Sequence, residues 1–180
     1  MDSRGHVRIS DLGLAVEIPE DHTVSRGGGT PGYIAPEVVK NEQYTFSPDY
    51  FSLGCLIFEM IEGTVPFPVK KEKVKTPDAK KQLYIDAFDG EERYSSQFSN
   101  SASDICHALL KRSVNKRLGC ISGCHGAKDV MAHPWFSTIN WKRLEGGKES
   151  PLFVPDPNCI YAKDRFDIKR FSNIKHPRLK

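Results

Sequence analysis

The chain has 180 residues, and its 26 Lys and Arg against 23 Asp and Glu give a formal net charge of +3. With 38% apolar and 27% charged residues, it has the composition of one globular domain, which excludes collagen-like and disordered chains. Because the charge is weak and no apolar run reaches the ~20 residues of a membrane span, we expect no nucleic-acid binding and no transmembrane helix.

The first forty residues predict little regular structure. Two short β-rich runs, at residues 7–9 and 14–18, predict a small β-hairpin. Residues 19–32 are polar and contain three consecutive glycines, which predicts a loop. Residues 35–40 predict one helical turn, with Pro36 near its start.

The clearest helix follows at residues 50–61. Ser47 or Asp49 can cap it, and Gly63 is expected to end it. Nine of the twelve residues from 50 to 61 are apolar, and they cover nearly every face. Such a helix is expected to be buried all round, at the centre of a helical core.

The remaining elements are expected to be helical until the chain becomes irregular. Periodic apolar residues predict helices within 70–90, at 102–110 and at 129–133. After Phe136, three prolines within seven residues favour an extended segment that runs over a surface. We therefore expect a mainly α fold with a hairpin at its front and an extended tail.

Five cysteines are present, and without a secretion signal we expect free thiols rather than disulfides. Cys120, Cys124 and His125 resemble half of a zinc site. The second cysteine pair is missing, so a Gly-rich loop is the simpler interpretation.

Several motifs occur in a characteristic order. Residues 11–13 read DLG and residues 35–37 read APE, with GTPGY at 29–33 between them. DYFSLG follows at 49–54, KRLG at 116–119 and HPWF at 133–136. In this order the motifs resemble the activation segment and large lobe of eukaryotic protein kinases.

The resemblance extends to one branch of these kinases. RISDLGLA at residues 8–15, FVPDP at 153–157 and IYAKD at 160–164 are similar to the G-protein-coupled receptor kinases of the AGC group. The sequence of these segments is more similar to the rhodopsin-kinase and non-visual subtypes than to the β-adrenergic receptor kinases. The resemblance implies a partial kinase domain at residues 1–136 and an AGC-kinase C-terminal tail at 137–180.

The resemblance also implies roles for individual residues. Asp11 would bind the Mg2+ that bridges the phosphates of ATP, and Gly13 would permit the turn that aims it. Phe171 would contribute to the nucleotide site from the tail. Asp49 would accept hydrogen bonds from the catalytic loop, or act as a plain helix cap. The remaining residues would form the substrate platform and a structural ion pair: Thr30, Pro31, Gly32 and Tyr33 for the platform, Glu37 with Arg117 for the pair.

The chain also departs from the family. The Gly-rich phosphate loop, the strand lysine with its glutamate, and the catalytic loop are absent from these 180 residues. All of them would precede Asp11, so the pattern indicates a truncation, and we expect the chain alone to have no kinase activity and to bind ATP and Mg2+ weakly or not at all. In addition, the family pattern leads us to expect a valine near Gly28.

These observations predict part of a Ser/Thr kinase that phosphorylates activated G-protein-coupled receptors. A non-catalytic module that binds a receptor or regulator is the alternative. Residues 70–81 carry six basic and two acidic side chains, and residues 163–180 carry seven and two. Both segments can be plain solvated surface, or can contact an acidic partner or an anionic membrane. We expect a cytoplasmic protein, with peripheral contact at the plasma membrane as the alternative.

Overall fold

A computed structural model describes residues 1–20, 22–69, 76–121 and 126–156. Those residues form two compact units, Leu12–Ile139 and a smaller one that contains Met1–Asp11 and the described residues from Asn140 onward. The elements in chain order are η1 (Leu12–Leu14), α1 (Pro36–Lys40), α2 (Ser47–Glu62), α3 (Pro77–Ala87), α4 (Asn100–Leu109), η2 (Val114–Lys116), α5 (Ala127–Met131), η3 (Pro134–Phe136) and α6 (Trp141–Glu145).

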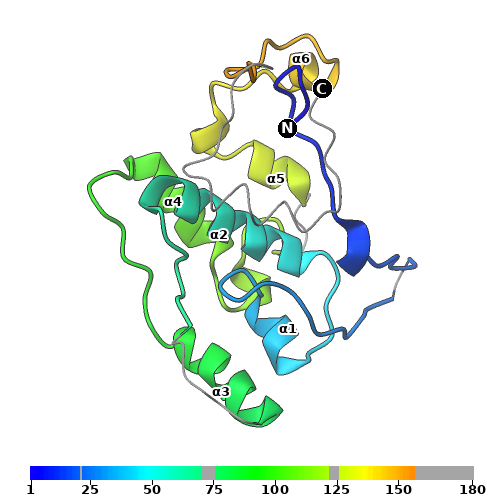
Figure 1. Cartoon of the computed structure of the whole chain (residues 1–180), viewed down its shortest axis with the longest axis vertical. Coiled ribbons are helices and arrows are strands. Elements are labelled where there is room, and N and C mark those ends of the chain that lie inside the picture. The colour runs from blue at the N-terminus through cyan, green and yellow to red at the C-terminus, as the bar shows by residue number, and fades with distance from the viewer. Residues whose placement is uncertain (21, 70–75, 122–125, 157–180) are drawn as a thin grey trace, which may run out of the picture. The chain divides into compact units, whose positions relative to one another are not determined.

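The larger unit is built on the pairing of α2 with α4, which lie against each other in Figure 1. Gly54 of α2 makes this close approach possible, since a β-carbon there would lie 2.9 Å from Cβ of Leu109. The core around the two helices is fully buried at Phe51 and Cys55 of α2 and at Ile105 of α4. Burying such side chains supplies ~1.5–3 kcal/mol each, so this pair forms the stable centre of the unit.

Aromatic rings extend the core beyond the two helices. Phe51 stacks on Phe67 with ring centroids 5.9 Å apart, and Phe88 contacts both rings edge-on. At the next turns of α2, Phe58 lies 5.2 Å from Phe98 and 5.6 Å from Tyr94. These contacts attach the chain that follows α3 to α2.

The helices at 35–40, within 70–90 and at 102–110 are confirmed by α1, α3 and α4, while residues 70–75 lie outside the described part. The helix expected at 129–133 is present as α5, two residues earlier. Pro36 occupies the first turn of α1, and Gly63 ends α2 in the left-handed conformation at φ 81°. The sequence signals that begin and end helices therefore locate most of this unit.

Four details of the prediction are wrong. In place of the hairpin at 7–18, the described residues contain only the η1 turn, because Val7 and Ile9, 83% and 92% exposed, have no surface to pack on. The residue before α2 is Phe46, and neither Ser47 nor Asp49 caps the helix.

The other two corrections concern helix surroundings and the tail. α2 is not buried all round, since Leu56 and Met60 are 47% and 78% exposed on one strip of the helix. The segment after Phe136 contains a helix, α6, because Asn140 caps it by accepting a hydrogen bond from the Arg143 backbone N–H at 3.2 Å.

Candidate functional site

The predicted substrate platform is a turn held against α2. The backbone N–H of Tyr33 donates to the Thr30 carbonyl at 3.1 Å, which closes the turn and leaves Thr30 and Pro31 exposed. The Ser52 hydroxyl donates to the Tyr33 carbonyl at 3.0 Å, and the Tyr33 hydroxyl donates to Glu59. Two side chains of α2 therefore fix the inner side of the turn while its outer side faces solvent.

Glycine is required at the centre of this turn. Gly32 has φ 94°, and a β-carbon there would lie 3.0 Å from both methyl groups of Val65. Most side chains avoid that backbone conformation, and the Val65 methyls leave no room for one. The third platform residue, Gly32, is thus fixed by both its dihedral angle and its neighbour.

The loop that leads into the platform is attached at its base. Val24 and Tyr44 form an isolated antiparallel bridge, and the Tyr44 hydroxyl donates to the Arg26 carbonyl at 2.7 Å. Beyond this point Gly28 and Gly29 have φ values of 144° and 124°. The path of the loop from Arg26 to the platform therefore depends on glycine.

Glu37 and Arg117 lie together, although 80 residues separate them in sequence. Arg117 donates from Nη1 to Oε1 of Glu37 at 2.6 Å and from Nη2 to Oε2 at 3.0 Å, and both side chains are almost completely buried. Ser47 completes the site, because its hydroxyl donates to Glu37 and its carbonyl accepts from Arg117. The pair thus joins α1, the first turn of α2 and the chain after α4.

The electrostatics of this pair follow from its contacts. Burial by itself would raise the pKa of Glu37, but the hydrogen bonds and charge of Arg117, with the Ser47 hydroxyl, hold it below its ordinary value. The guanidinium also lies 5.0 Å from the ring centroid of Phe51. Its remaining N–H groups donate to backbone carbonyls of Lys111 and Arg112, at 2.9 and 3.4 Å. The charge of Arg117 is therefore fully compensated.

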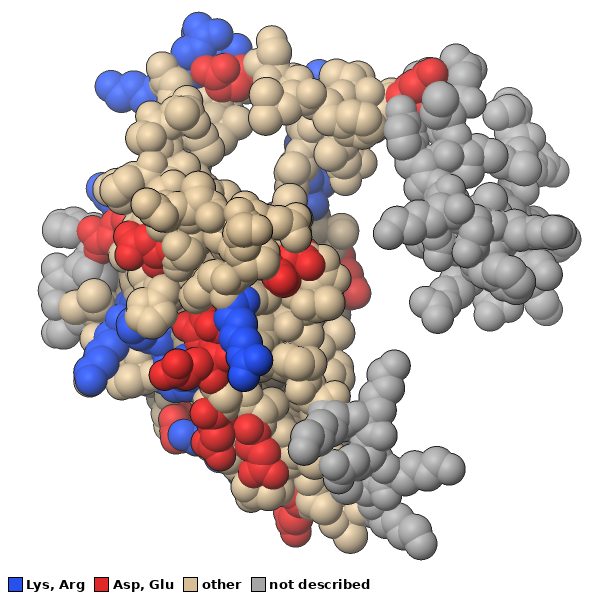
Figure 2. Space-filling model, turned by 90° about the vertical axis from the view of Figure 1, so that its left-hand side faces the viewer, with Lys and Arg blue, Asp and Glu red and all other residues tan. Residues whose placement is uncertain are grey.

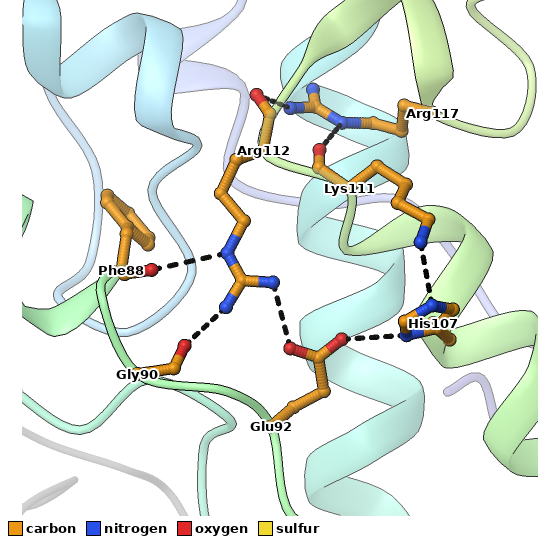
Figure 3. Close-up of polar contacts among 7 residues, drawn as sticks. All are labelled: Phe88, Gly90, Glu92, His107, Lys111, Arg112 and Arg117. Carbon is orange, nitrogen blue, oxygen red and sulfur yellow. Dashed lines mark hydrogen bonds and ion pairs between the residues drawn. The ribbon is translucent and has the colours of Figure 1, made fainter.

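A second arginine, Arg112, forms the network shown in Figure 3. It donates to Oε2 of Glu92 at 2.9 Å and to the backbone carbonyls of Phe88 and Gly90. Its guanidinium lies 4.7 Å from the ring centroid of Phe67. Arg112 thus attaches the chain after α3 to the end of α4.

His107 completes the network on the other oxygen of Glu92. Nδ1 of His107 lies 3.2 Å from Oε1 of Glu92, and Nζ of Lys111 lies 2.7 Å from Nε2 of His107. Because an ammonium group only donates, Nε2 accepts, and the Nδ1 hydrogen donates to Glu92. Burial would raise the pKa of Glu92, but its backbone hydrogen bond, Arg112 and His107 lower it below its ordinary value.

Sequence reasoning missed several of these contributors. Ser47 was expected only as a cap, Ser52 lay in the DYFSLG motif without an assigned role, and Glu59 lay in no motif. Glu92 and Arg112 lie in polar runs typical of solvated surface, so no local signal distinguished them. On the face drawn in Figure 2, acidic and basic side chains lie beside one another, which is consistent with such pairing.

The residues predicted for metal and nucleotide are described each within its own unit. Asp11 is exposed at φ 57° in the smaller unit, and Gly13 lies in η1 of the larger one. Within the described ranges no three His, Cys, Asp or Glu side chains gather as a metal site. Mg2+ is commonly held by one or two carboxylates together with nucleotide phosphates, so the role of Asp11 stays a prediction. Asp49 is exposed, and Phe171, Cys124 and His125 lie outside the described residues.

Comparison with known proteins gives a consistent family. A model of the protein kinase domain matches residues 1–136. The chain is 54% identical over 177 residues to G protein-coupled receptor kinase 2 of Drosophila melanogaster, which covers 97% of this chain and 24% of that protein. It is 49% identical to G protein-coupled receptor kinase 4 of Rattus norvegicus, over 97% of this chain and 29% of that protein. It is 41% identical to human rhodopsin kinase, over 97% and 30%. The chain thus spans 24–30% of the length of these curated relatives.

Proposed function

The chain belongs to the protein kinase family, and from this premise we propose that it forms the substrate side of a Ser/Thr kinase that phosphorylates activated G-protein-coupled receptors. The observation that carries the proposal is the identity of 41–54% to receptor kinases over 97% of the chain. In this proposal residues 1–136 are part of the kinase domain and residues 137–180 are its C-terminal tail. Its greater likeness to the rhodopsin-kinase and non-visual subtypes than to the β-adrenergic receptor kinases stays a prediction from the sequence.

The geometry supports a positioning role. Phosphoryl transfer depends chiefly on holding the substrate hydroxyl in line and on stabilising charge. The turn at Thr30–Tyr33 is suited to the first task because α2 fixes it through Ser52 and Glu59. The Glu37–Arg117 pair, four residues further along the chain, fixes the other end of this segment. We infer that these contacts make a firm surface for a peptide that carries Ser or Thr.

Protein kinases use ATP and Mg2+, and the chain supplies only part of such a site. We propose that Asp11 provides one carboxylate to the metal in a complete enzyme, with Gly13 and Phe171 at the nucleotide. We expect the 180 residues by themselves to bind nucleotide weakly or not at all and to show no turnover.

Activity is tested in a chimera. The 177 matching residues of the Drosophila relative are replaced by those of this chain, and transfer of labelled phosphate from ATP to an agonist-occupied receptor is measured. We expect more label on the active receptor than on the inactive one, and a loss to background in Asp11→Asn. A folded chimera that labels neither receptor form would contradict the proposal.

The isolated chain provides the complementary experiment. Incubation with ATP, Mg2+ and an acidic Ser peptide should give no more product than the Asp11→Asn variant. Turnover above that variant would show that the chain is a catalyst by itself. Binding of active receptor without turnover in either experiment would favour a non-catalytic module.

Membrane contact is the last element of the proposal. No helix among the described residues is long and apolar enough to span a bilayer. We propose a cytoplasmic protein whose basic segments, at 70–81 and 163–180, contact anionic lipid or acidic receptor tails. Of these segments only residues 76–81 lie within the described part. Co-sedimentation with phosphatidylserine vesicles, compared with phosphatidylcholine vesicles, tests the lipid contact.

A further inference from the structure

Ser113, on the chain between α4 and η2, has the most basic sequence surroundings of any Ser or Thr in the chain. The four residues on each side of it include four Lys or Arg and no Asp or Glu. Ser172, which lies outside the described residues, comes next with three and none. Because kinases select their substrates partly by charge, the hydroxyl of Ser113 suits an enzyme whose peptide site is acidic.

The structure leaves this hydroxyl accessible. Ser113 is exposed, its backbone is extended at φ −79° and ψ 118°, and its hydroxyl donates to Oδ1 of Asn115 at 2.6 Å. Among the neighbouring cations only Arg117 is buried, so an approaching enzyme would meet the other three on the surface. These three are Lys111, Arg112 and Lys116.

A cavity of about 630 Å3 lies beside this hydroxyl and is lined by both Ser113 and Asn115. The chain at the end of α1 lines the same cavity with Lys40 and Glu42. Neither of these two charged side chains forms an ion pair with a residue that the structure describes. Arg112 also lines the cavity, but its guanidinium is engaged by Glu92 and by backbone carbonyls. Lys40 is therefore the cation of this cavity that is available to an anion.

We propose that Ser113 is a phosphorylation site and that Lys40 holds its phosphate in this cavity. The modifying enzyme is a second kinase with an acidic peptide site, so the inference goes beyond the proposed function of this chain. Oγ of Ser113 attacks the γ-phosphorus of ATP, the Oγ–P bond forms, and the bond from that phosphorus to the β–γ bridging oxygen breaks. ADP leaves, and the hydroxyl proton passes to the base of the modifying enzyme. The product carries about −1.5 to −2 charges and three strong acceptor oxygens.

The groups that line the cavity supply partners for this phosphate. Nζ of Lys40 can make a charge-assisted hydrogen bond to one phosphate oxygen. Asn115 loses the hydroxyl hydrogen that it accepts, and its amide group can turn over so that Nδ2 donates to the phosphate. Glu42 opposes the contact, because its carboxylate has the same sign of charge. The phosphate would thus connect η2 to the end of α1, beside the connection between Glu37 and Arg117.

The site itself is tested by incubating the folded full chain with ATP, Mg2+ and a purified kinase that selects basic peptides, and locating the phosphate by mass spectrometry. We expect phosphate on Ser113 and the loss of most of the incorporated label in Ser113→Ala. Ser96→Ala is the matched control, since Ser96 is also exposed but has one acidic and one basic residue within four positions, and it should be labelled like the wild type. A chain that takes up phosphate only elsewhere, at Ser172 for example, or not at all would refute the proposal.

The role of Lys40 is tested by hydrogen exchange at the backbone amides of Asn41 and Glu42, which donate to carbonyls of α1. Phosphorylation should slow their exchange by about two- to fivefold, as expected when one exposed ion pair holds the end of the helix. Lys40→Gln should abolish this slowing. Lys116→Gln is the matched control, because Lys116 is an exposed cation near Ser113 that does not line the cavity, and it should retain the slowing. Each variant is compared with its own unphosphorylated form.

The outcomes separate a specific contact from a general effect of charge. Equal slowing in Lys40→Gln and Lys116→Gln would show that the phosphate does not act through Lys40, and would overturn the proposed contact. Faster exchange on phosphorylation would overturn it as well, because repulsion from Glu42 would then exceed the attraction of Lys40. A larger slowing in Glu42→Gln than in the wild type would support the contact, since that change removes the opposing carboxylate.

Discussion

Two arginines, Arg112 and Arg117, lie five residues apart on the chain that follows α4, and each pairs with a glutamate. The two pairs differ in burial, in sequence separation and in hydrogen-bond geometry. Arg117 and Glu37 are 0% and 2% exposed and join segments 80 residues apart. The Arg112 side chain is 32% exposed, and its partner Glu92 lies only 20 residues away. Arg117 meets its carboxylate with two nitrogens, whereas Arg112 uses one and gives the others to backbone carbonyls.

The difference shows how the two networks divide the structural work. The inner pair, Arg117 with Glu37, connects α1, which follows the platform, to the core helices. Its loss is expected to detach from the core the segment that is proposed to hold substrate. The outer pair, Arg112 with Glu92, holds the chain after α3. Water can reach its exposed arginine side and replace part of the lost hydrogen bonding. A buried pair is costly to break because one charge remains without its partner. In the outer pair Glu92 is only 4% exposed, but Arg112 is 32% exposed and His107 still contacts the carboxylate, so less is lost.

The largest effect is therefore expected from Arg117→Ala. It leaves the Glu37 carboxylate buried without its cation, which should lower the free energy of unfolding by about 3–5 kcal/mol. Arg117→Lys keeps the charge but cannot make two parallel hydrogen bonds, so it should lose a substantial part of the same stabilisation. Urea denaturation followed by circular dichroism measures both. Wild-type stability of the alanine variant would show that the pair of Arg117 with Glu37 is dispensable, and wild-type stability of the lysine variant would show that its two parallel hydrogen bonds are.

Acid should weaken both pairs. The folded-state pKa of Glu37 and of Glu92 lies below the ordinary value of 4.5. A lowered pKa stabilises the fold fully above pH 4.5, and this contribution declines as the pH falls through the folded-state values. The free energy of unfolding, measured between pH 7 and pH 3, should decrease below pH 4.5. The decrease should be shallower in Glu37→Gln and in Glu92→Gln, and an unchanged slope in both would contradict the assignment.

The contrast also explains what the sequence could predict. The helices followed from apolar periodicity and from local signals such as Pro36 and Gly63, which mark helix ends. Ser99 and Thr76, which were not singled out in the sequence, each accept a capping bond at 3.2 Å. The contact of Glu37 with Arg117 has no local signal, since no spacing rule relates residues 80 apart. Only the family resemblance suggested it. The roles of Glu92 and Arg112 were not suggested by either source.

The errors have physical causes of the same kind. Val7 and Ile9 have the propensity of strand residues, but propensity forms a strand only where a partner or a surface covers it. The apolar pattern of α2 predicted burial on every face, yet exposure depends on which elements pack there, as Leu56 and Met60 show. The α6 cap, Asn140, was a readable signal that the nearby prolines outweighed.

A smaller effect is expected when the outer pair is broken. Arg112→Ala removes the charged hydrogen bonds to Glu92 and to two carbonyls, and should cost about 1.5–3 kcal/mol. His107 remains on Glu92 and limits the loss. The NMR signals of the Val38 and Val39 methyl groups in α1 should not move, because Arg117 still holds that helix. The division between the two networks would fail if Arg112→Ala destabilised the chain more than Arg117→Ala.

The smallest effect is expected at the ion pair of Arg143 with Glu149, in the smaller unit. Its atoms lie 2.7 Å apart, as close as those of the inner pair, but its side chains are 56% and 36% exposed. Exposed pairs contribute roughly 0–1 kcal/mol because water and salt screen them. Arg143→Ala should therefore change the unfolding free energy by less than about 1 kcal/mol, and the change should vanish in 1 M salt. Because distance is matched and exposure is not, a loss as large as that of Arg117→Ala would show that burial does not govern the order of the three arginines.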